Sequence, residues 1–172
     1  MSEAIPLLAH AASIGTGATV LMDVWTVVRR HMFKVPALDY ALVGRWLLYL
    51  SRGRWRHDPI ASTQPVAGER PVGWIAHYLT GIVFAVVLVA FAGPAWIEQP
   101  TIGPAMAVGV GSVVAPFFLL QPALGAGVAG SRTARPAMAR LHSLMTHAIF
   151  GLGLYASAWM TSLLAHPVAL AG

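Results

Sequence analysis

The sequence predicts an all-α, polytopic membrane protein in which residues 1–172 form a single membrane domain with four transmembrane helices. The chain is 57% hydrophobic and only 10% charged, with a mean hydropathy of +0.68, whereas a soluble domain carries about 25% charged residues. An α-helix needs about 20 mostly apolar residues to cross the hydrocarbon core of a bilayer. Four stretches meet that requirement: residues 5–28, 71–92, 102–124 and 136–164.

Helix-terminating residues stand at the ends of these spans. Pro71 and Pro136 suit the first turn of a helix, where an N–H group has no intrahelical partner. Gly93 and Pro94 predict a sharp end to the second span. The chain contains no Cys, which excludes disulfides, thiolate metal ligands and a cysteine nucleophile.

The distribution of charge predicts the orientation of the chain. All 11 Lys and Arg residues lie in or beside two connections, whereas the other side has only Glu3 and Glu98. Since basic residues are retained on the cytoplasmic side, we expect both basic connections there and both termini on the opposite side. Positive charge follows the first span rather than preceding it, so we expect a retained helix and not a cleaved signal peptide. The basic residues are Arg29, Arg30, Lys34, Arg45, Arg52, Arg54, Arg56 and Arg70, then Arg132, Arg135 and Arg140.

The long basic connection, residues 29–70, is expected to contain a short helix at about residues 36–50. Leu38, Trp46 and Tyr49 fall on one stripe at helical spacing, which indicates an interfacial helix on the cytoplasmic leaflet. A helix packed under the bundle fits the same pattern equally well. The basic cluster predicts contact with anionic cytoplasmic lipids, and we do not expect nucleic acid as a partner.

Weak internal similarity indicates two tandem two-helix repeats. A His-x-x-x-Gly motif occurs in the second and fourth spans, and a Gly-x-Gly motif occurs in the first and third. Repeats in this orientation are related by an axis along the membrane normal. The matched positions are His77 and His147, Gly81 and Gly151, and Gly15 and Gly109.

Polar side chains form a layer at similar depth inside the four predicted spans. Asp23 is the one charged residue that lies well inside a predicted span. A charge in hydrocarbon costs about 2.5–3.5 kcal/mol on insertion scales, so Asp23 requires a partner or a function. Position along a helix sets depth, at about 1.5 Å per residue, but leaves open which way each side chain points. The predicted polar or transport site comprises Asp23, Thr19, His77, Gln121, His142 and His147.

Three functions fit this layer, and the sequence leaves them open. Asp and His can relay or bind a proton, a metal ion or a small solute along a transport path, and a metal would use Asp23, His77 and His147. A haem-binding electron-transfer protein would use His77 and His147 as axial ligands. In a non-catalytic accessory or assembly subunit, the layer would only fix helix packing.

The remaining sequence features bear on mechanism and assembly. No nucleophile motif, phosphate loop, dinucleotide fingerprint or H-E-x-x-H motif occurs, which favours a non-enzymatic role. Pro116 and Pro122 interrupt the third span, and such breaks are tolerated where protein or a water-filled cavity satisfies the freed carbonyls. One four-helix bundle is thin for a closed path, so we expect a homo-oligomer or a subunit of a larger membrane complex.

Several longer motifs cover nearly the whole chain. They are G-A-T-V-L-M-D-V-W (17–25), A-L-V-G-R-W (41–46), G-W-I-A-H-Y (73–78), Q-P-A-L-G-A-G (121–127) and R-L-H-S-L-M-T-H-A-I-F-G-L-G-L-Y (140–155). Through them the sequence resembles the uncharacterised bacterial family "domain of unknown function 2938". The resemblance implies a location in the bacterial inner membrane, where the charge distribution places both termini on the periplasmic side. It implies no activity, cofactor or functional residue.

Overall fold

The protein is all-helical, as the sequence predicts. The structure, a computed structural model, describes residues 4–35 and 37–165, and these ranges contain no β-strand. The helices are α1 (Ala4–Phe33), α2 (Tyr40–Leu50), α3 (Glu69–Ala92), α4 (Ile102–Gly111), α5 (Gln121–Ala123) and α6 (Pro136–Ala165). They are joined in part by 3-10 turns (Ile60–Ser62, Pro94–Ile97 and Val128–Gly130) and by a π-helical turn (Pro116–Leu120).

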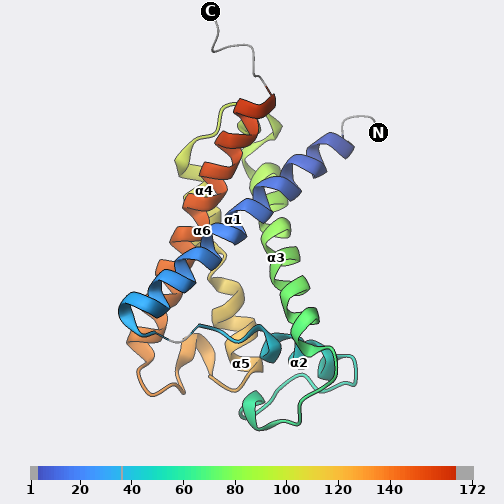
Figure 1. The fold of residues 1–172 in the computed structure, drawn as a ribbon, viewed down its shortest axis with the longest axis vertical. Coiled ribbons are helices and arrows are strands. Elements are labelled where there is room, and N and C mark those ends of the chain that lie inside the picture. The colour runs from blue at the N-terminus through green and yellow to red at the C-terminus, as the bar shows by residue number, and fades with distance from the viewer. Residues whose placement is uncertain (1–3, 36, 166–172) are drawn as a thin grey trace, which may run out of the picture.

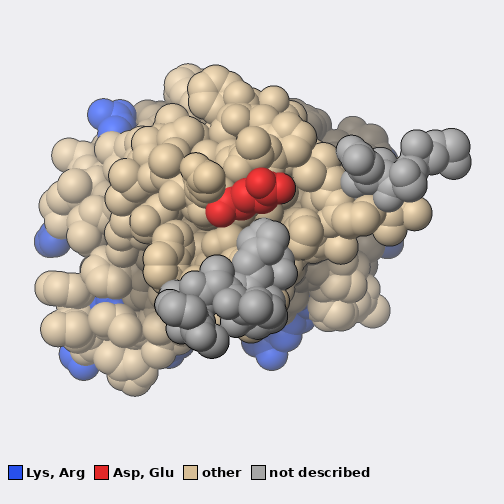
Figure 2. Space-filling model, turned by 90° about the horizontal axis from the view of Figure 1, so that it is seen from above, with Lys and Arg blue, Asp and Glu red and all other residues tan. Residues whose placement is uncertain are grey.

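The long helices run between two ends of different character (Figure 1). The start of α1 and the end of α6 lie together at what we call the terminal end. At the opposite end lie α2, α5 and the Arg-bearing connections over residues 51–68 and 124–135, and we call this the basic end. Viewed onto the terminal end, the surface shows acidic atoms near its middle and Lys and Arg only at its margins (Figure 2). The charge asymmetry of the sequence therefore follows the long axis of the bundle.

Three helical stretches are long and apolar enough to cross a membrane: Ile5–Phe33, Glu69–Ala92 and Ile102–Ala123. They correspond to the first three predicted spans. Their outward faces are apolar, with Val83 57% and Phe91 71% exposed, which is compatible with a membrane location. The fourth long helix, α6, has 30 residues and is not among the three described stretches that meet both requirements.

Small residues bring the backbones of neighbouring helices close together. A Cβ added at Gly15 of α1 would lie 2.6 Å from the Cα of Ile82 in α3, and one at Gly109 of α4 would collide with the backbone of Gly151 in α6. α1 also packs along α6, where a Cβ at Gly153 would lie 2.8 Å from the Cα of Ala18. Close helix approach over Gly and Ala is typical of membrane bundles, in which packing replaces the hydrophobic effect between helices.

Large buried apolar side chains form a core between α1, α3, α4 and α6. This core borders a cavity at the rings of Phe84 and Phe150, which meet edge to face with centroids 6.4 Å apart. The bundle is therefore densely filled on one side of these rings and hollow on the other. The core residues include Ile14, Leu88, Val89, Trp96, Ile97 and Leu154.

The third span is not one regular helix. After α4 ends at Gly111, the chain turns and then forms the π-helical turn over Pro116–Leu120, which the N–H of Gln121 closes by donating to the carbonyl of Pro116. Pro has no N–H to donate to a preceding turn, so the predicted break at Pro116 has a direct structural cause. π-helical turns inside helices frequently occur at functional sites, and this one lines the cavity.

The short helix of the basic connection begins later than expected. Of the predicted range 36–50, Pro36 lies outside the described residues, and α2 starts only at Tyr40 because the Asp39 side chain caps it, accepting from the N–H of Ala41 at 3.0 Å. The helix packs against α3 beneath the bundle, and the Gly44 and Gly73 backbones are close enough that a Cβ on either would collide with the other helix. The structure thus has the second of the two arrangements that the sequence left open.

Arg45, which lies off the apolar stripe of α2, is buried rather than solvated. Its guanidinium donates to both carboxylate oxygens of Glu69 at 2.8 Å and to the carbonyls of Ile60 and Thr63. The side chains of Arg45 and Glu69 are only 8% and 15% exposed. This paired ion bridge fixes α2, the start of α3 and the intervening connection relative to one another.

The connection after α2 docks onto the segment that follows the π-helical turn. The N–H of His57 donates to the carbonyl of Ala123 at 2.9 Å, and the N–H of Ile60 donates to Leu124 at 3.0 Å. Gly125 has a φ of +94°, and a Cβ there would lie 2.7 Å from the carbonyl oxygen of His57. The Q-P-A-L-G-A-G motif therefore serves as the docking edge for this connection.

Candidate functional site

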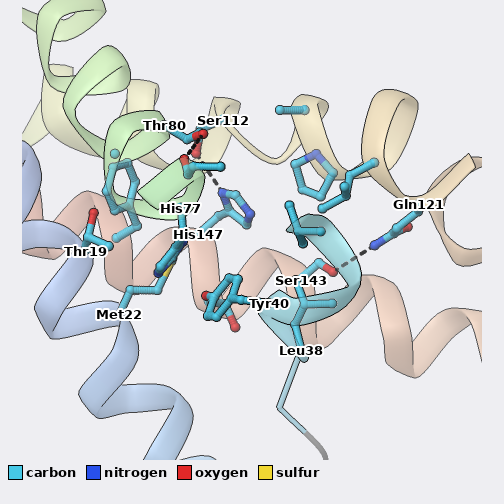
Figure 3. Close-up of a pocket in the computed structure, with 18 of the residues that line it drawn as sticks. Thr19, Met22, Leu38, Tyr40, His77, Thr80, Ser112, Gln121, Ser143 and His147 are labelled. Atoms are coloured by element: carbon cyan, nitrogen blue, oxygen red, sulfur yellow. Dashed lines mark hydrogen bonds between the residues drawn. The ribbon is translucent and has the colours of Figure 1, made fainter. Parts of the chain in front are cut away.

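A cavity of about 410 Å³ lies between the helices toward the basic end. Side chains from α1, α2, α3, α6 and the broken third span all line it. Figure 3 shows Tyr40 of α2, His77 of α3, and Ser143 and His147 of α6 approaching it. Its volume lies in the range of small-molecule binding sites, about 300–1,000 Å³. Its walls are largely apolar, with a few polar groups, which is also typical of such sites.

Asp23 and His77 pair across α1 and α3. The Nε2 atom of His77 lies 3.0 Å from Oδ1 of Asp23, and the hydroxyl of Tyr78 donates to Oδ2 at 3.1 Å. His77 lines the cavity, while Asp23 lines a second hollow together with Arg30 and Lys34. The partly buried carboxylate of Asp23 therefore has two partners, one of which lines the cavity.

Tyr40 covers the Asp23–His77 pair from α2. Its ring stacks on the His77 ring with centroids 4.1 Å apart and an interplanar angle of 24°, and Tyr40 lines both hollows. Burial, reinforced by the charge of Asp23, raises the pKa of Tyr40 well above its ordinary value. The phenol therefore stays neutral, so Tyr40 contributes a hydrogen-bonding hydroxyl and no charge to the wall between the hollows.

His147 has a defined tautomer. Its Nδ1 atom lies 2.7 Å from Oγ of Ser112, and the single hydrogen of that hydroxyl is donated to the carbonyl of Gly109 at 2.6 Å. Because Ser112 has no second hydrogen to give, Nδ1 of His147 is the donor, an assignment that follows from the hydrogen-bond network. In the neutral ring Nε2 then carries the lone pair, so His147 offers an acceptor in the wall of the cavity.

Gln121 and His142 line the cavity from α5 and from α6. The Nε2 of Gln121 makes a long hydrogen bond of 3.4 Å to Oγ of Ser143. Its Oε1 and the Nδ1 of His142 are both buried and have no hydrogen-bond partner within the described chain. Buried polar atoms are almost always satisfied in native proteins, so two such atoms in one wall indicate room for a missing polar partner.

Arg29 is the site residue that the sequence reasoning missed, because a basic residue at the end of a span reads as a topology signal. α1 continues past the predicted end of the first span to Phe33 and carries Arg29 into the cavity wall, where the residue is only 9% exposed. Arg29 lies three residues after Thr26, on the same helical stripe as Thr19. Extending that stripe by one step would have identified it.

The structure brings all of the predicted polar residues except Asp23 to the lining of the cavity. His77, Gln121, His142, His147 and Thr19 all line the cavity, although the Thr19 hydroxyl donates to its own helix at the carbonyl of Gly15. Asp23 reaches the cavity only through His77.

The cofactor predictions fit this geometry less well. Over residues 4–35 and 37–165, no group of three or more His, Asp or Glu side chains lies close enough to hold a metal ion, so Asp23, His77 and His147 do not assemble as a three-ligand set. A haem iron would need a ring nitrogen of His77, whose Nε2 faces Asp23. Within the described residues these side chains thus form no three-ligand group, and the haem ligands stay a prediction.

Comparisons with known proteins place the chain in a family but give no function. A model of the family described as "Protein of unknown function (DUF2938)" matches residues 12–161. No curated protein and no solved structure matches the chain.

Proposed function

This chain belongs to the DUF2938 family, as its motifs predict, and we propose that it is an integral membrane protein that binds and moves a small solute through the cavity at its basic end. The observation that carries the proposal is a cavity of about 410 Å³ lined by α1, α3, α6 and the broken third span, with buried, unpartnered polar atoms in its wall. A protein that used this layer only for packing would be expected to fill the space and satisfy those atoms.

The proposal includes four membrane spans, with α6 as the fourth. An even number of crossings agrees with the start of α1 and the end of α6 lying at the same end (Figure 1). The charge distribution supports an orientation with the basic end in the cytoplasm of a bacterial cell and both termini in the periplasm. In this orientation the dense core faces the periplasm, and α2 lies at the cytoplasmic interface beside anionic lipids, closing the cavity from below.

The matching glycine contacts support two related halves. Gly15 of α1 meets α3 near Gly81, and Gly109 of α4 meets α6 at Gly151, each at the position that the internal similarity pairs. The two halves would enclose the solute at their interface, as repeats do in many transporters. We propose that the assembly is a homo-oligomer or part of a larger membrane complex, because one bundle offers few walls for a closed path.

The Asp23–His77 pair supplies a route for coupling to protons. Asp23 lines the hollow that also contains Arg30 and Lys34, and His77 lines the solute cavity. A proton taken up by the carboxylate can pass to the imidazole through the 3.0 Å contact between them. Coupling of this kind would link occupancy of the cavity to the protonation of a group in the wider hollow.

The test compares a filled cavity with a matched outward substitution. Ala115→Phe places a ring in the cavity wall, whereas Val83→Phe places the same ring on an outward face that is already 57% exposed. Small molecules that co-purify with each protein in lipid nanodiscs are extracted and identified by mass spectrometry. We expect a molecule that is enriched with the wild type and Val83→Phe and absent from Ala115→Phe. Identical extracts from all three folded proteins would favour an accessory subunit instead.

The topology can be tested separately, because the chain has no native Cys. Single cysteines at Ser51 and Gln99, in connections at opposite ends of the bundle, are labelled in intact cells with an impermeant maleimide. We expect Gln99→Cys to react from outside and Ser51→Cys to react only after the cells are opened. The reverse pattern, or labelling of both from outside, would contradict the four-span arrangement.

A further inference from the structure

We propose that the solute of this cavity is an amphipathic oxyanion, a molecule with a carboxylate or phosphate head and an apolar body, whose head binds Arg29. This inference rests on the proposed solute-binding function and names the class of solute.

The first step is the state of Arg29. The residue is only 9% exposed. None of the ion pairs among the described residues involves it. Its Nε has no hydrogen-bond partner in the described part of the chain, and its Nη1 makes only a 3.5 Å contact with Oγ1 of Thr146. A guanidinium stays charged in proteins, and a buried charge without a partner is strongly unfavourable.

The second step is that the nearest carboxylate is already engaged. Asp23, one and a half turns earlier on α1, accepts from His77 and Tyr78 and does not line the cavity. The other ion pairs of the described chain, Arg45 with Glu69 and Arg132 with Asp58, lie at the basic end outside the bundle. The charge on Arg29 therefore lacks a counter-ion that the described chain could supply.

The third step places other polar groups beside Arg29. Thr146, the contact of Arg29, and Ser143, the contact of Gln121, are three residues apart on α6 and so share one face of that helix. His142, with its unpartnered Nδ1, lies one turn before Thr146 on α6 and shares its face. Arg29, Gln121 and His142 all line the cavity and carry unpartnered polar atoms, which suits a compact polar head with several acceptor atoms.

The fourth step concerns the rest of the cavity. Beyond this polar corner the lining includes Leu119, Leu120, Phe84 and Phe150, which suit an apolar body. A small inorganic anion would leave this space unfilled. The combination favours a head-and-tail molecule, whether a soluble organic acid or a membrane lipid.

The experiment measures binding of octanoate and of its neutral analogue octanamide to the delipidated protein in detergent, by calorimetry. We expect octanoate to bind the wild type at least about tenfold more tightly than octanamide, since hydrogen bonds to charged groups are the stronger ones. Arg29→Gln should lose this preference, and Arg29→Lys should keep most of it. The matched control is Arg135→Gln, which removes the same charge from an exposed residue that lines neither hollow and should behave like the wild type.

Two outcomes would overturn the inference. One is equal binding of octanoate and octanamide to the wild type, a result that needs no variant and therefore does not depend on whether Arg29→Gln folds. The other is an unchanged octanoate preference in folded Arg29→Gln. Either result would leave the proposed function intact if Ala115→Phe still removes the co-purified molecule. Octanoate binding in nanodiscs of phosphatidylglycerol or of phosphatidylcholine identifies the source of the anionic head. Competition by the anionic lipid alone assigns the site to a lipid head group. No competition by either lipid assigns it to a soluble organic acid.

Discussion

Removing Arg45 should destabilise the protein far more than removing an exposed basic residue of the same end. In Arg45→Met the Glu69 carboxylate, 15% exposed, loses two hydrogen bonds of 2.8 Å and retains only the N–H of Val66 at 2.9 Å. The pair is buried in the fold, and the hydrogen bond with Glu69 raises the pKa of Arg45 further, so the guanidinium is charged at every relevant pH. Breaking a buried pair by removing one partner costs about 3–5 kcal/mol.

We take the lower value, about 3 kcal/mol, because Glu69 still accepts a hydrogen bond from the N–H of Val66. The measurement is the free energy of unfolding by SDS titration in mixed micelles. The control is Arg132→Met, since Arg132 and its partner Asp58 are 51% and 69% exposed and such pairs contribute about 0–1 kcal/mol. Adding Glu69→Leu to Arg45→Met should recover much of the loss, because no charge is then left without a partner. If Arg45→Met cost no more than Arg132→Met, the proposed anchoring of α2 would be wrong.

Three further predictions concern packing, pH and the carboxylate. Gly109→Ala should lower the free energy of unfolding by about 2 kcal/mol in the same SDS titration, because its Cβ collides with α6. Gly103→Ala on the same helix meets no atom within 4 Å and should be neutral. Equal effects of the two substitutions would contradict the close contact. Burial lowers the pKa of His57, so the unfolded chain binds a proton that the folded chain does not. The free energy of unfolding should therefore fall as the pH drops below about 6.5. A His57→Leu variant whose stability falls equally steeply with decreasing pH would refute this. Asp23→Leu should lower stability by about 1–3 kcal/mol because His77 loses its partner, whereas Asp23→Asn, still able to hydrogen-bond, should lose less; a smaller loss for Leu would count against the pairing.

The helices were predictable because each corresponds to a long, mostly apolar stretch of sequence. About 20 apolar residues must be continuous, and residues 71–92 and 136–164 deviate from α3 and α6 by no more than two residues at either end. The break at Pro116 was also predictable, since Pro removes a specific backbone donor. The start of α2 was not predictable from the apolar stripe. The Asp39 side chain caps the helix, so the helix begins at Tyr40 and does not include the residues before it.

Depth was predictable within the site, but rotation was not. The sequence placed Asp23 and the three His at similar depth and left open which way each side chain points. The structure selects His77 and adds Tyr78, while His147 turns to Ser112. Which face of a helix meets which neighbour depends on glycine contacts such as Gly15 against α3, and a single sequence does not give those crossings.

The account depends most on a ligand occupying the cavity between the helices with its head at Arg29. The most direct measurement is an experimental density map of the wild type in lipid nanodiscs with octanoate. We predict continuous density in the cavity whose head lies about 2.8 Å from the Arg29 guanidinium, the distance of a charge-assisted hydrogen bond. A cavity filled by protein side chains, or an Arg29 paired with a carboxylate of the chain itself, would contradict it.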